Sequence, residues 1–171
     1  KPEESFSYEL GVDHQINHNV AIGLSAYRNQ VDNLITFSNS QLDNVNKATF
    51  TGAEFNLDWQ YNALFASLSY AFVQPKNDQT KQDLTRRRHS TTLSAGWNDD
   101  LFGLTASVSA KSSSTDFADW PSTTPTKTPR YVTADLNAHY NIHPNVKLFA
   151  NVQNIADVKY KTAYNGNGIY Y

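Results

Sequence analysis

Apolar and polar residues alternate along most of this chain with a period of two. The stretch Arg130–Tyr140, RYVTADLNAHY, shows the pattern most clearly. Its even-numbered positions are apolar or aromatic, namely Val132, Ala134, Leu136, Ala138 and Tyr140. Its odd-numbered positions are mostly polar, namely Tyr131, Thr133, Asp135, Asn137 and His139. Because successive side chains of a β-strand point to opposite faces, the pattern predicts a strand with one apolar and one polar face.

The same alternation recurs in other segments of the chain, and helical spacing fits none of them. These segments are Phe6–Val12, Val20–Ala26, Ala53–Tyr61, Leu64–Phe72, Leu93–Trp97, Phe102–Ala110 and Val146–Val152. The predicted fold is therefore all-β, with about eight consecutive antiparallel strands. Each strand comes close to the roughly 9–11 residues that a tilted membrane-crossing strand needs, whereas soluble strands are nearer to about five or six.

The predicted connections alternate strictly between short and long. The short ones are His14–His18, Gln60–Ala63, Asn98–Leu101 and Asn141–Asn145. The long ones are Gln30–Asn46, Pro75–Thr85, Ser112–Pro129 and the run after Ile155. All short turns therefore fall at one end of the sheet, as in transmembrane β-barrels with brief periplasmic turns and longer extracellular loops. A soluble sandwich built of Greek keys has no reason to keep this alternation.

Large aromatic residues of the apolar face cluster at both ends of the predicted strands. Those beside the short turns are Trp59, Tyr61, Trp97 and Tyr140. Those toward the long connections are Phe6, Tyr8, Tyr70 and Phe72. Two such bands match the aromatic girdles of a lipid-facing surface. The apolar face is thus expected to meet lipid and the polar face a watery lumen; aromatics that cap a soluble core are the competing interpretation.

Composition narrows these classes further. Hydrophobic residues make up 39% of the 171 residues, and no run approaches the roughly 18 apolar residues of a membrane helix. The net charge of −2 gives no basic excess of the kind that nucleic acid attracts. Cysteine is absent, which excludes disulfides and cysteine metal sites. The chain opens on Lys1-Pro2-Glu3-Glu4 without a signal peptide, so either a leader is removed or the chain begins inside a larger protein.

Three stretches resemble the TonB-dependent outer-membrane receptor family. NVQNIADVKY, Asn151–Tyr160, is similar to the Asn-Leu-Phe-Asp-x-x-Tyr signature of that family's penultimate strand, although Ala156 replaces the usual Phe. TFTGAEFNLDW, Thr49–Trp59, resembles the family's Gly-x-Glu strand, and YRNQVDNLI, Tyr27–Ile35, resembles the segment before it.

The resemblance implies a plugged barrel of about 22 strands, of which this chain supplies about eight. Residues 1–171 would then be the C-terminal portion of the barrel, and GNGIYY, Gly166–Tyr171, would begin the last strand. The plug domain, the earlier strands and most of the last strand would lie outside this chain. They would also be its main partners, because unpaired strand edges are costly in lipid.

The function implied by the resemblance is active uptake of a scarce ligand across the bacterial outer membrane. The ligand would be a ferric siderophore, haem, cobalamin or a similar metal chelate, and TonB would supply the energy through the plug. No cofactor and no catalytic residue are expected, because the sequence lacks a motif such as a nucleophile elbow. A smaller passive barrel, either a porin or a lipid-modifying enzyme, and a soluble β-sandwich binding module are the alternatives.

Candidate ligand-binding residues lie toward the long connections. Arg86 and Arg88 share the polar register and would receive an anionic ligand, or else pair with lumen carboxylates such as Glu54 and Asp58. Phe117 and Trp120 are large aromatics on a long polar loop, where they would contact a ligand or pack within the loop. The pairs His14 with His18 and His139 with His143 bracket short turns, and turn solvation is favoured over metal binding there.

A basic set continues the apolar register at the predicted extracellular ends of the strands. Its members are Arg28, Lys47, Arg87, His89 and Arg130, and no acidic residue is expected to share their register positions. Because charge costs only roughly 0–1 kcal/mol at a membrane interface, these residues are expected to contact lipopolysaccharide phosphates there. Ordinary solvated strand ends are the alternative.

Overall fold

The computed structural model describes residues 2–38, 41–78, 87–117 and 125–162, and every regular element within these ranges is a β-strand. The strands are β1 (Glu4–Asn17), β2 (Val20–Ser38), β3 (Gln41–Tyr61), β4 (Leu64–Asn77), β5 (His89–Asn98), β6 (Phe102–Lys111), β7 (Ser114–Phe117), β8 (Pro125–Thr128), β9 (Tyr131–His143) and β10 (Val146–Val152). Within the same ranges, no helix is long and apolar enough to cross a membrane.

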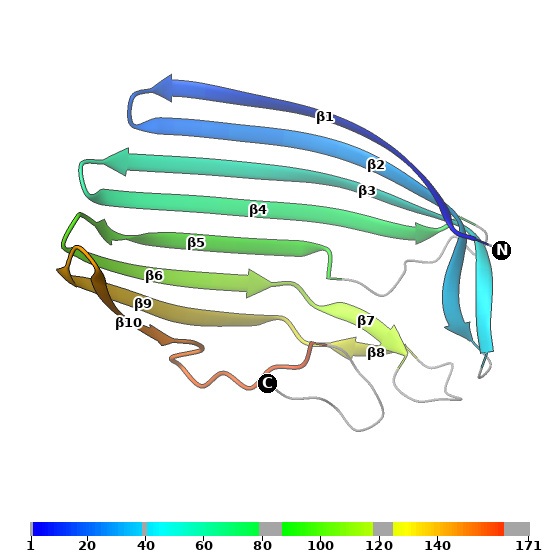
Figure 1. Cartoon of the computed structure of the whole chain (residues 1–171). Helices are drawn as coiled ribbons and strands as arrows, with labels where there is room; N and C mark the ends of the chain where they lie inside the picture. Colours follow the sequence, from blue (N-terminus) through cyan, green and yellow to red (C-terminus); the bar gives the residue numbers. More distant parts are fainter. Residues whose placement is uncertain (1, 39–40, 79–86, 118–124, 163–171) are drawn as a thin grey trace.

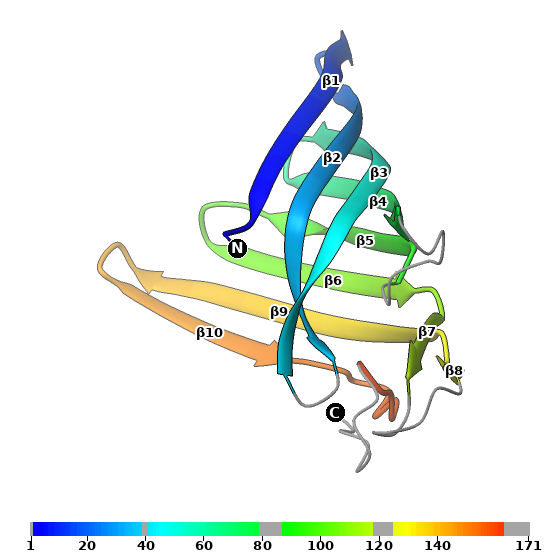
Figure 2. The ribbon, with the colours of Figure 1, turned by 90° about the vertical axis from the view of Figure 1, so that its right-hand side faces the viewer.

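Eight of the strands form one antiparallel sheet in the order β1-β2-β3-β4-β5-β6-β9-β10 (Figure 1). Strands β7 and β8 pair separately as a short ribbon between β6 and β9. The main sheet is a single curved and twisted layer with β1 and β10 at its two edges (Figure 2). The prediction of an all-β fold with eight consecutive antiparallel strands is therefore confirmed.

The backbone register gathers most of the apolar residues of the eight main strands on one face. Residues paired across an antiparallel ladder share a face, and Ile22, Leu57, Leu68, Leu93, Val108 and Ala134 form one continuous row of such pairs. Nothing in the described ranges covers this face, since Leu10 on β1 is 81% exposed and Leu148 on β10 is 57% exposed. A soluble domain would bury such a row against a second layer.

The four short turns lie at one end of the sheet, as predicted (Figure 1). Backbone hydrogen bonds join neighbouring turns there, from Gln60 N to Asn19 O at 2.8 Å and from Asn98 N to Ala63 O at 2.7 Å. The first turn is tighter than expected, because β1 continues to Asn17. His14 consequently lies inside β1, paired with Ile22 in the apolar register, and does not flank the turn.

The long connection expected at Gln30–Asn46 is wrong. Strands β2 and β3 run on as a paired hairpin to Ser38 and Gln41, so they have 19 and 21 residues. The segment 29–50 contains neither Gly nor Pro and is rich in Val, Ile, Leu and Phe, which favour extended pairing over an irregular loop. This hairpin projects beyond the rest of the sheet (Figures 1 and 2).

Two further long connections also contain regular structure. Strand β4 extends through Pro75 to Asn77, and the β7–β8 ribbon occupies much of Ser112–Pro129. After β10, the Ile155 N–H donates to Ala134 O at 2.8 Å, which keeps the chain beside β9. The stretch Gly166–Tyr171, expected to begin a last strand, lies outside the described residues.

Candidate binding surface on the polar face

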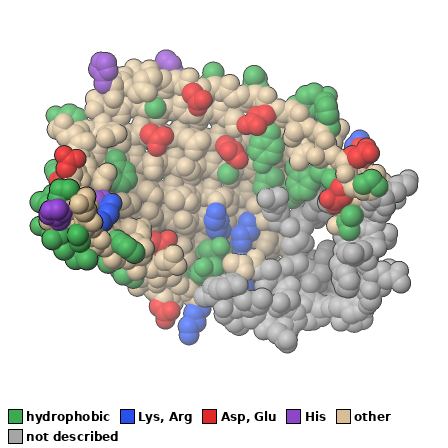
Figure 3. All heavy atoms as spheres, in the orientation of Figure 1, with side chains coloured by type: hydrophobic (Ala, Val, Ile, Leu, Met, Phe, Trp, Pro, Cys, Tyr) green, Lys and Arg blue, Asp and Glu red, His purple; other side chains and the backbone are tan. Residues whose placement is uncertain are grey.

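Small hydroxyl and amide side chains line the middle of the polar face. One row of register partners consists of Asp13, Gly23, Asn56, Ser69, Thr92, Ser109 and Thr133. The hydroxyl oxygens of Thr92 and Ser109 lie 3.2 Å apart, and those of Ser94 and Ser107 lie 2.8 Å apart. The face that Figure 3 shows has few hydrophobic side chains over the middle of the sheet. Such a wall suits water and polar solutes, because lipid would leave many of these groups without partners.

Carboxylates are distributed over the same face, mainly on β1 to β3. Glu54 and Asp58 lie on β3 in the polar register, opposite Ser25 and Ala21 of β2. Near the short turns, a hollow of about 650 Å³ includes Asp58, His18 and Asn98 in its lining. Its polar lining can accept hydrogen bonds and cations from whatever occupies the concave side of the sheet.

A basic side chain, that of Lys111, occupies the polar face toward the opposite end. Lys111 on β6 pairs with Ser90 of β5, and its ammonium donates a hydrogen bond to the Ser90 hydroxyl. Arg88 precedes β5, and its carbonyl accepts a hydrogen bond from Val73 N at 2.9 Å. Sequence analysis named Arg88 but missed Lys111, although Lys111 follows Ser107 and Ser109 in the polar register. Arg86 lies outside the described residues.

The two aromatic ligand candidates are placed only in part. Phe117 is the last residue of β7, and its backbone pairs with that of Pro125 on β8. Trp120 lies outside the described residues. The structure therefore locates the backbone of Phe117 on a ribbon beside the end of β6.

Arg87 makes contacts that differ from its expected outward role. Its guanidinium donates to the carbonyl oxygens of Ser112, Pro129 at 2.9 Å and Lys161 at 2.6 Å. The guanidinium carbon also lies 4.7 Å from the ring centre of Tyr131, a polar-face residue. Arg87 thus joins three segments of the protein through its guanidinium.

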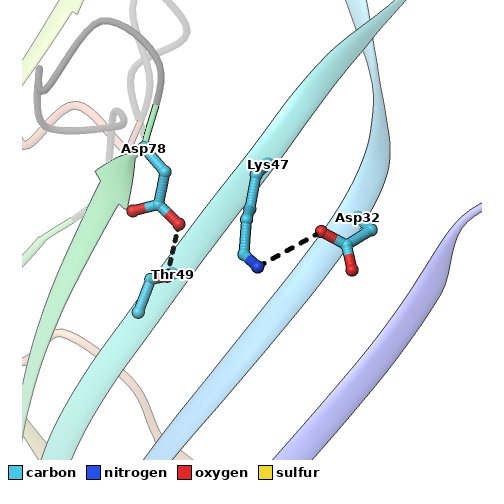
Figure 4. A network of polar contacts seen from close by, with 4 residues as sticks. All are labelled: Asp32, Lys47, Thr49 and Asp78. Atoms are coloured by element: carbon cyan, nitrogen blue, oxygen red, sulfur yellow. Dashed lines mark hydrogen bonds and ion pairs between the residues drawn. The ribbon is translucent and has the colours of Figure 1, made fainter.

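Arg28, Lys47 and His89 keep the expected outward register, with one correction, and Arg130 precedes β9. Lys47 Nζ lies 3.7 Å from Asp32 Oδ1, and the two residues are register partners on β3 and β2 (Figure 4). The expectation that no acidic residue shares these positions is therefore wrong. Beside this pair, Thr49 Oγ1 donates to Asp78 Oδ2 at 2.7 Å, which joins β3 to the end of β4 (Figure 4).

His89, Tyr70 and Phe72 form a cluster on the apolar face, and Phe6 and Tyr8 form a separate pair. The His89 ring nitrogen Nδ1 lies 2.8 Å from the Tyr70 hydroxyl, and the His89 ring centre is 5.1 Å from that of Phe72. Phe6 and Tyr8 make an edge-to-face pair at 4.6 Å on β1. At the opposite end, register pairing aligns Tyr61, Leu64, Trp97 and Leu104 across β3 to β6.

Asp99 organises the turn between β5 and β6. Its carboxylate accepts hydrogen bonds from Trp97 Nε1 at 2.7 Å, Leu101 N at 2.8 Å and Phe102 N at 2.7 Å. The Trp97 hydrogen bond, followed by those from Phe102 and Leu101, lowers the pKa of Asp99 below its ordinary value. Among the described residues, no group of three or more His, Cys, Asp or Glu side chains is arranged to hold a metal ion.

Comparison with known proteins gives one consistent family. The family described as "TonB dependent receptor-like, beta-barrel" matches residues 1–155. The vitamin B12 transporter BtuB of Vibrio vulnificus is 26% identical over 178 residues, which cover 100% of this chain and 28% of that protein. BtuB of Photobacterium profundum is 28% identical over 180 residues, which cover 96% of this chain and 28% of that protein.

Solved structures share the fold. A mutant of the ferric enterobactin receptor PfeA from Pseudomonas aeruginosa superposes with a TM-score of 0.80 at 24% identity, covering 98% of this chain and 27% of the receptor. The siderophore receptor PirA from Acinetobacter baumannii has a TM-score of 0.77 at 17% identity, covering 93% and 28% of the two chains. The chain thus spans between a quarter and a third of the length of each relative.

Proposed function

The chain belongs to the TonB-dependent receptor β-barrel family, and we propose that it forms part of the wall of an outer-membrane receptor that imports a scarce ligand. The family is one of transport receptors. The observation that carries the proposal is the two-faced sheet. Its outer face is an uncovered apolar surface, and its inner face is a wall of hydroxyl, amide and charged groups. A lipid-embedded barrel with an aqueous interior needs both faces.

We propose that residues 1–171 are the C-terminal portion of this barrel. The plug domain and the other strands of about 22 would complete it and satisfy the edges at β1 and β10. In this proposal the short turns face the periplasm and the β2–β3 hairpin and β7–β8 ribbon face outward. TonB would act on the plug and displace it. This chain would form the barrel wall around the plug and would perform no covalent chemistry.

The proposed ligand is a metal chelate such as a ferric siderophore, haem or cobalamin. The relatives named above are a vitamin B12 transporter, a ferric enterobactin receptor and a siderophore receptor. On this chain, the basic residues Arg86, Arg88 and Lys111 would attract an anionic chelate at the extracellular end of the lumen. Phe117 and Trp120 would supply aromatic contacts from the loop above them.

The outward basic residues are proposed to contact lipopolysaccharide. Arg28 and His89 are exposed in the outward register at the proposed extracellular end, and Arg130 is exposed just before β9. Lys47 also lies in the outward register, but it is paired with Asp32. Arg87 is not included among the proposed lipopolysaccharide contacts, because its guanidinium is bound to protein carbonyls. Aromatic residues of the apolar face would form the two interfacial girdles. These are Trp59, Tyr61, Trp97 and Tyr140 beside the short turns, and Phe6, Tyr8, Tyr70 and Phe72 toward the opposite end.

Uptake measurements test the proposal. The natural full-length protein should be the only receptor of its class in a host strain, which is then given radiolabelled cyanocobalamin, haemin or ferric enterobactin. Accumulation of one of these compounds that disappears when TonB is deleted would support the proposal. Uptake that is unchanged without TonB would contradict it and would favour a passive barrel.

A further inference from the structure

A groove of about 560 Å³ lies between the start of β9 and the segment that follows β10. Two short stretches line it, Lys127–Val132 and Val158–Lys161. It lies at the side of β9 where the ladder with β10 has ended at Val152, and Tyr131 in its lining is the register partner of Lys111. The groove is therefore a gap in the wall itself, at the proposed extracellular rim.

The charged residues that the structure describes in the groove lining are all basic. They are Lys127, Arg130, Lys159 and Lys161. Lys127, Arg130 and Lys159 are exposed, and within the described ranges the ion pair that is present joins Lys47 to Asp32 on other strands. The exposed cations Lys127, Arg130 and Lys159 repel one another, and an anion that enters the groove relieves that repulsion.

The groove walls are held in place by contacts that do not use these cations. The Tyr131 and Tyr160 rings stack with centres 4.1 Å apart, which joins the two lining stretches. Arg87 binds the carbonyls of Pro129 and Lys161 across the groove. Asn154 closes the following turn, because its side chain accepts from Val158 N at 3.0 Å and donates to Val158 O at 3.0 Å. The cation-bearing segments are thus positioned before any ligand arrives.

Part of the remaining lining is apolar and continues the lipid-facing surface. Pro129, Val132 and Val158 contribute carbon surface, and Val132 is 52% exposed in the same register as Ala110 and Val108. A soluble anion would gain nothing from this surface. A lipid that carries a phosphate group would match both parts, because its acyl chain can lie against the apolar face while its phosphate meets the cations.

We propose that this groove binds the phosphate group of an outer-leaflet lipid, with Arg130 and Lys159 as its principal contacts. The proposal relies on the outer-membrane location proposed above but not on the transported ligand. It assigns lipid contact to one structured groove, whereas the proposal above distributes it over separate basic residues at the rim. Arg130 suits a phosphate because its planar guanidinium donates two parallel hydrogen bonds, whereas Lys159 supplies a point charge.

Lipid binding to the natural full-length protein in nanodiscs tests the groove. Phosphatidic acid, a lipid with a phosphomonoester, is titrated into phosphatidylcholine nanodiscs, and bound lipid is counted by native mass spectrometry. Replacing both groove residues (R130Q with K159Q) should weaken retention of phosphatidic acid by at least about tenfold, which corresponds to the loss of one charge-assisted hydrogen bond. K76Q is the matched control, because Lys76 is an exposed cation of the outward register at the same end of β4 and lies outside the groove.

Two outcomes would overturn the proposal. Equal retention by the double variant and by K76Q would show that the groove cations are not the lipid contact. Displacement of phosphatidic acid by millimolar glycerol phosphate, with equal affinity for the two, would show a site for soluble phosphates. If the double variant loses phosphatidic acid but keeps normal TonB-dependent uptake, the lipid site is supported independently of the transported ligand. The two proposals can therefore fail separately.

Discussion

Gly52 on β3 lies directly beneath the ring of Tyr27 on β2. The two residues are register partners on the polar face, and a Cβ added at Gly52 would lie 2.4 Å from Tyr27 Cζ and 2.7 Å from the Phe72 carbonyl oxygen. They come from two different stretches that carried the family resemblance, YRNQVDNLI and TFTGAEFNLDW. Absence of a side chain at residue 52 therefore creates the space in which the Tyr27 ring rests on the strand.

Replacement of Gly52 by Ala is expected to destabilise the protein by about 1–3 kcal/mol, because an added methyl group would overlap the Tyr27 ring and the Phe72 carbonyl. Thermal unfolding in detergent measures the loss. Gly11→Ala is the matched control on the same face, since its Cβ would meet Ser25 at an ordinary 3.5 Å. Combining G52A with Y27A should restore only part of the lost stability, because the Phe72 carbonyl stays in place. A loss of stability in G11A as large as that in G52A would contradict this explanation.

The strand pattern and the lipid-facing register could be predicted because they depend on alternation, which each strand carries locally. Leu57 and Leu68, for example, each follow the apolar alternation of their own strand, and they pair on one face. The extent of the β2–β3 hairpin could not be predicted in this way, because polar residues such as Asn44 and Asn46 interrupt the alternation while backbone pairing continues.

Site residues were harder to predict than the fold. Arg87 occupies an outward register position in the sequence, but it precedes β5, where alternation no longer determines direction, and its guanidinium reaches carbonyls up to 74 residues away. Lys111 had the required signal, a cation at the end of a polar row, and was overlooked. The groove between Lys127–Val132 and Val158–Lys161 depends on a contact between distant stretches that no local pattern encodes.

The Asp99 turn should stabilise the protein in a pH-dependent way. The pKa of Asp99 is lowered in the folded state, so its contribution is present above the pKa of the unfolded state and disappears as pH falls through the folded pKa. Asp99→Asn should therefore lower Tm at neutral pH, and the difference from the natural protein should shrink on acidification below the ordinary range of an aspartate. Asp100→Asn serves as the control. A Tm difference that does not change with pH would mean that the Asp99 charge is unimportant.

Charge on the apolar face should impair assembly in the membrane. Arg in place of Leu57, Leu68, Leu104 or Leu136 is expected to cost roughly 2–4 kcal/mol near mid-membrane. Arg in place of Asn56 or Asn137, neighbours on the polar face, should cost much less. The yield of folded, heat-modifiable protein in outer membranes reports the difference. Equal losses on both faces would be inconsistent with a lipid-facing row.

The two ends of the sheet should be labelled from opposite sides of the membrane. Single Cys residues placed at Lys76 or Lys127 should react with an impermeant maleimide on intact cells. Cys at Asp99 or Asn145, beside the short turns, should react only after the outer membrane is opened. Labelling of the Asp99 position on intact cells would reverse the proposed orientation of every strand.

The most direct test of a membrane wall is the environment of consecutive residues along β6. Spin labels are attached one at a time to Cys at Leu104, Thr105, Ala106, Ser107, Val108 and Ser109 in the natural full-length protein in lipid bilayers, and their access to oxygen and to a water-soluble nickel complex is measured. Labels at 104, 106 and 108 should meet oxygen and avoid nickel, whereas labels at 105, 107 and 109 should show the reverse. Equal access of all six labels to the nickel complex would contradict the assignment of this sheet to a lipid-facing barrel wall.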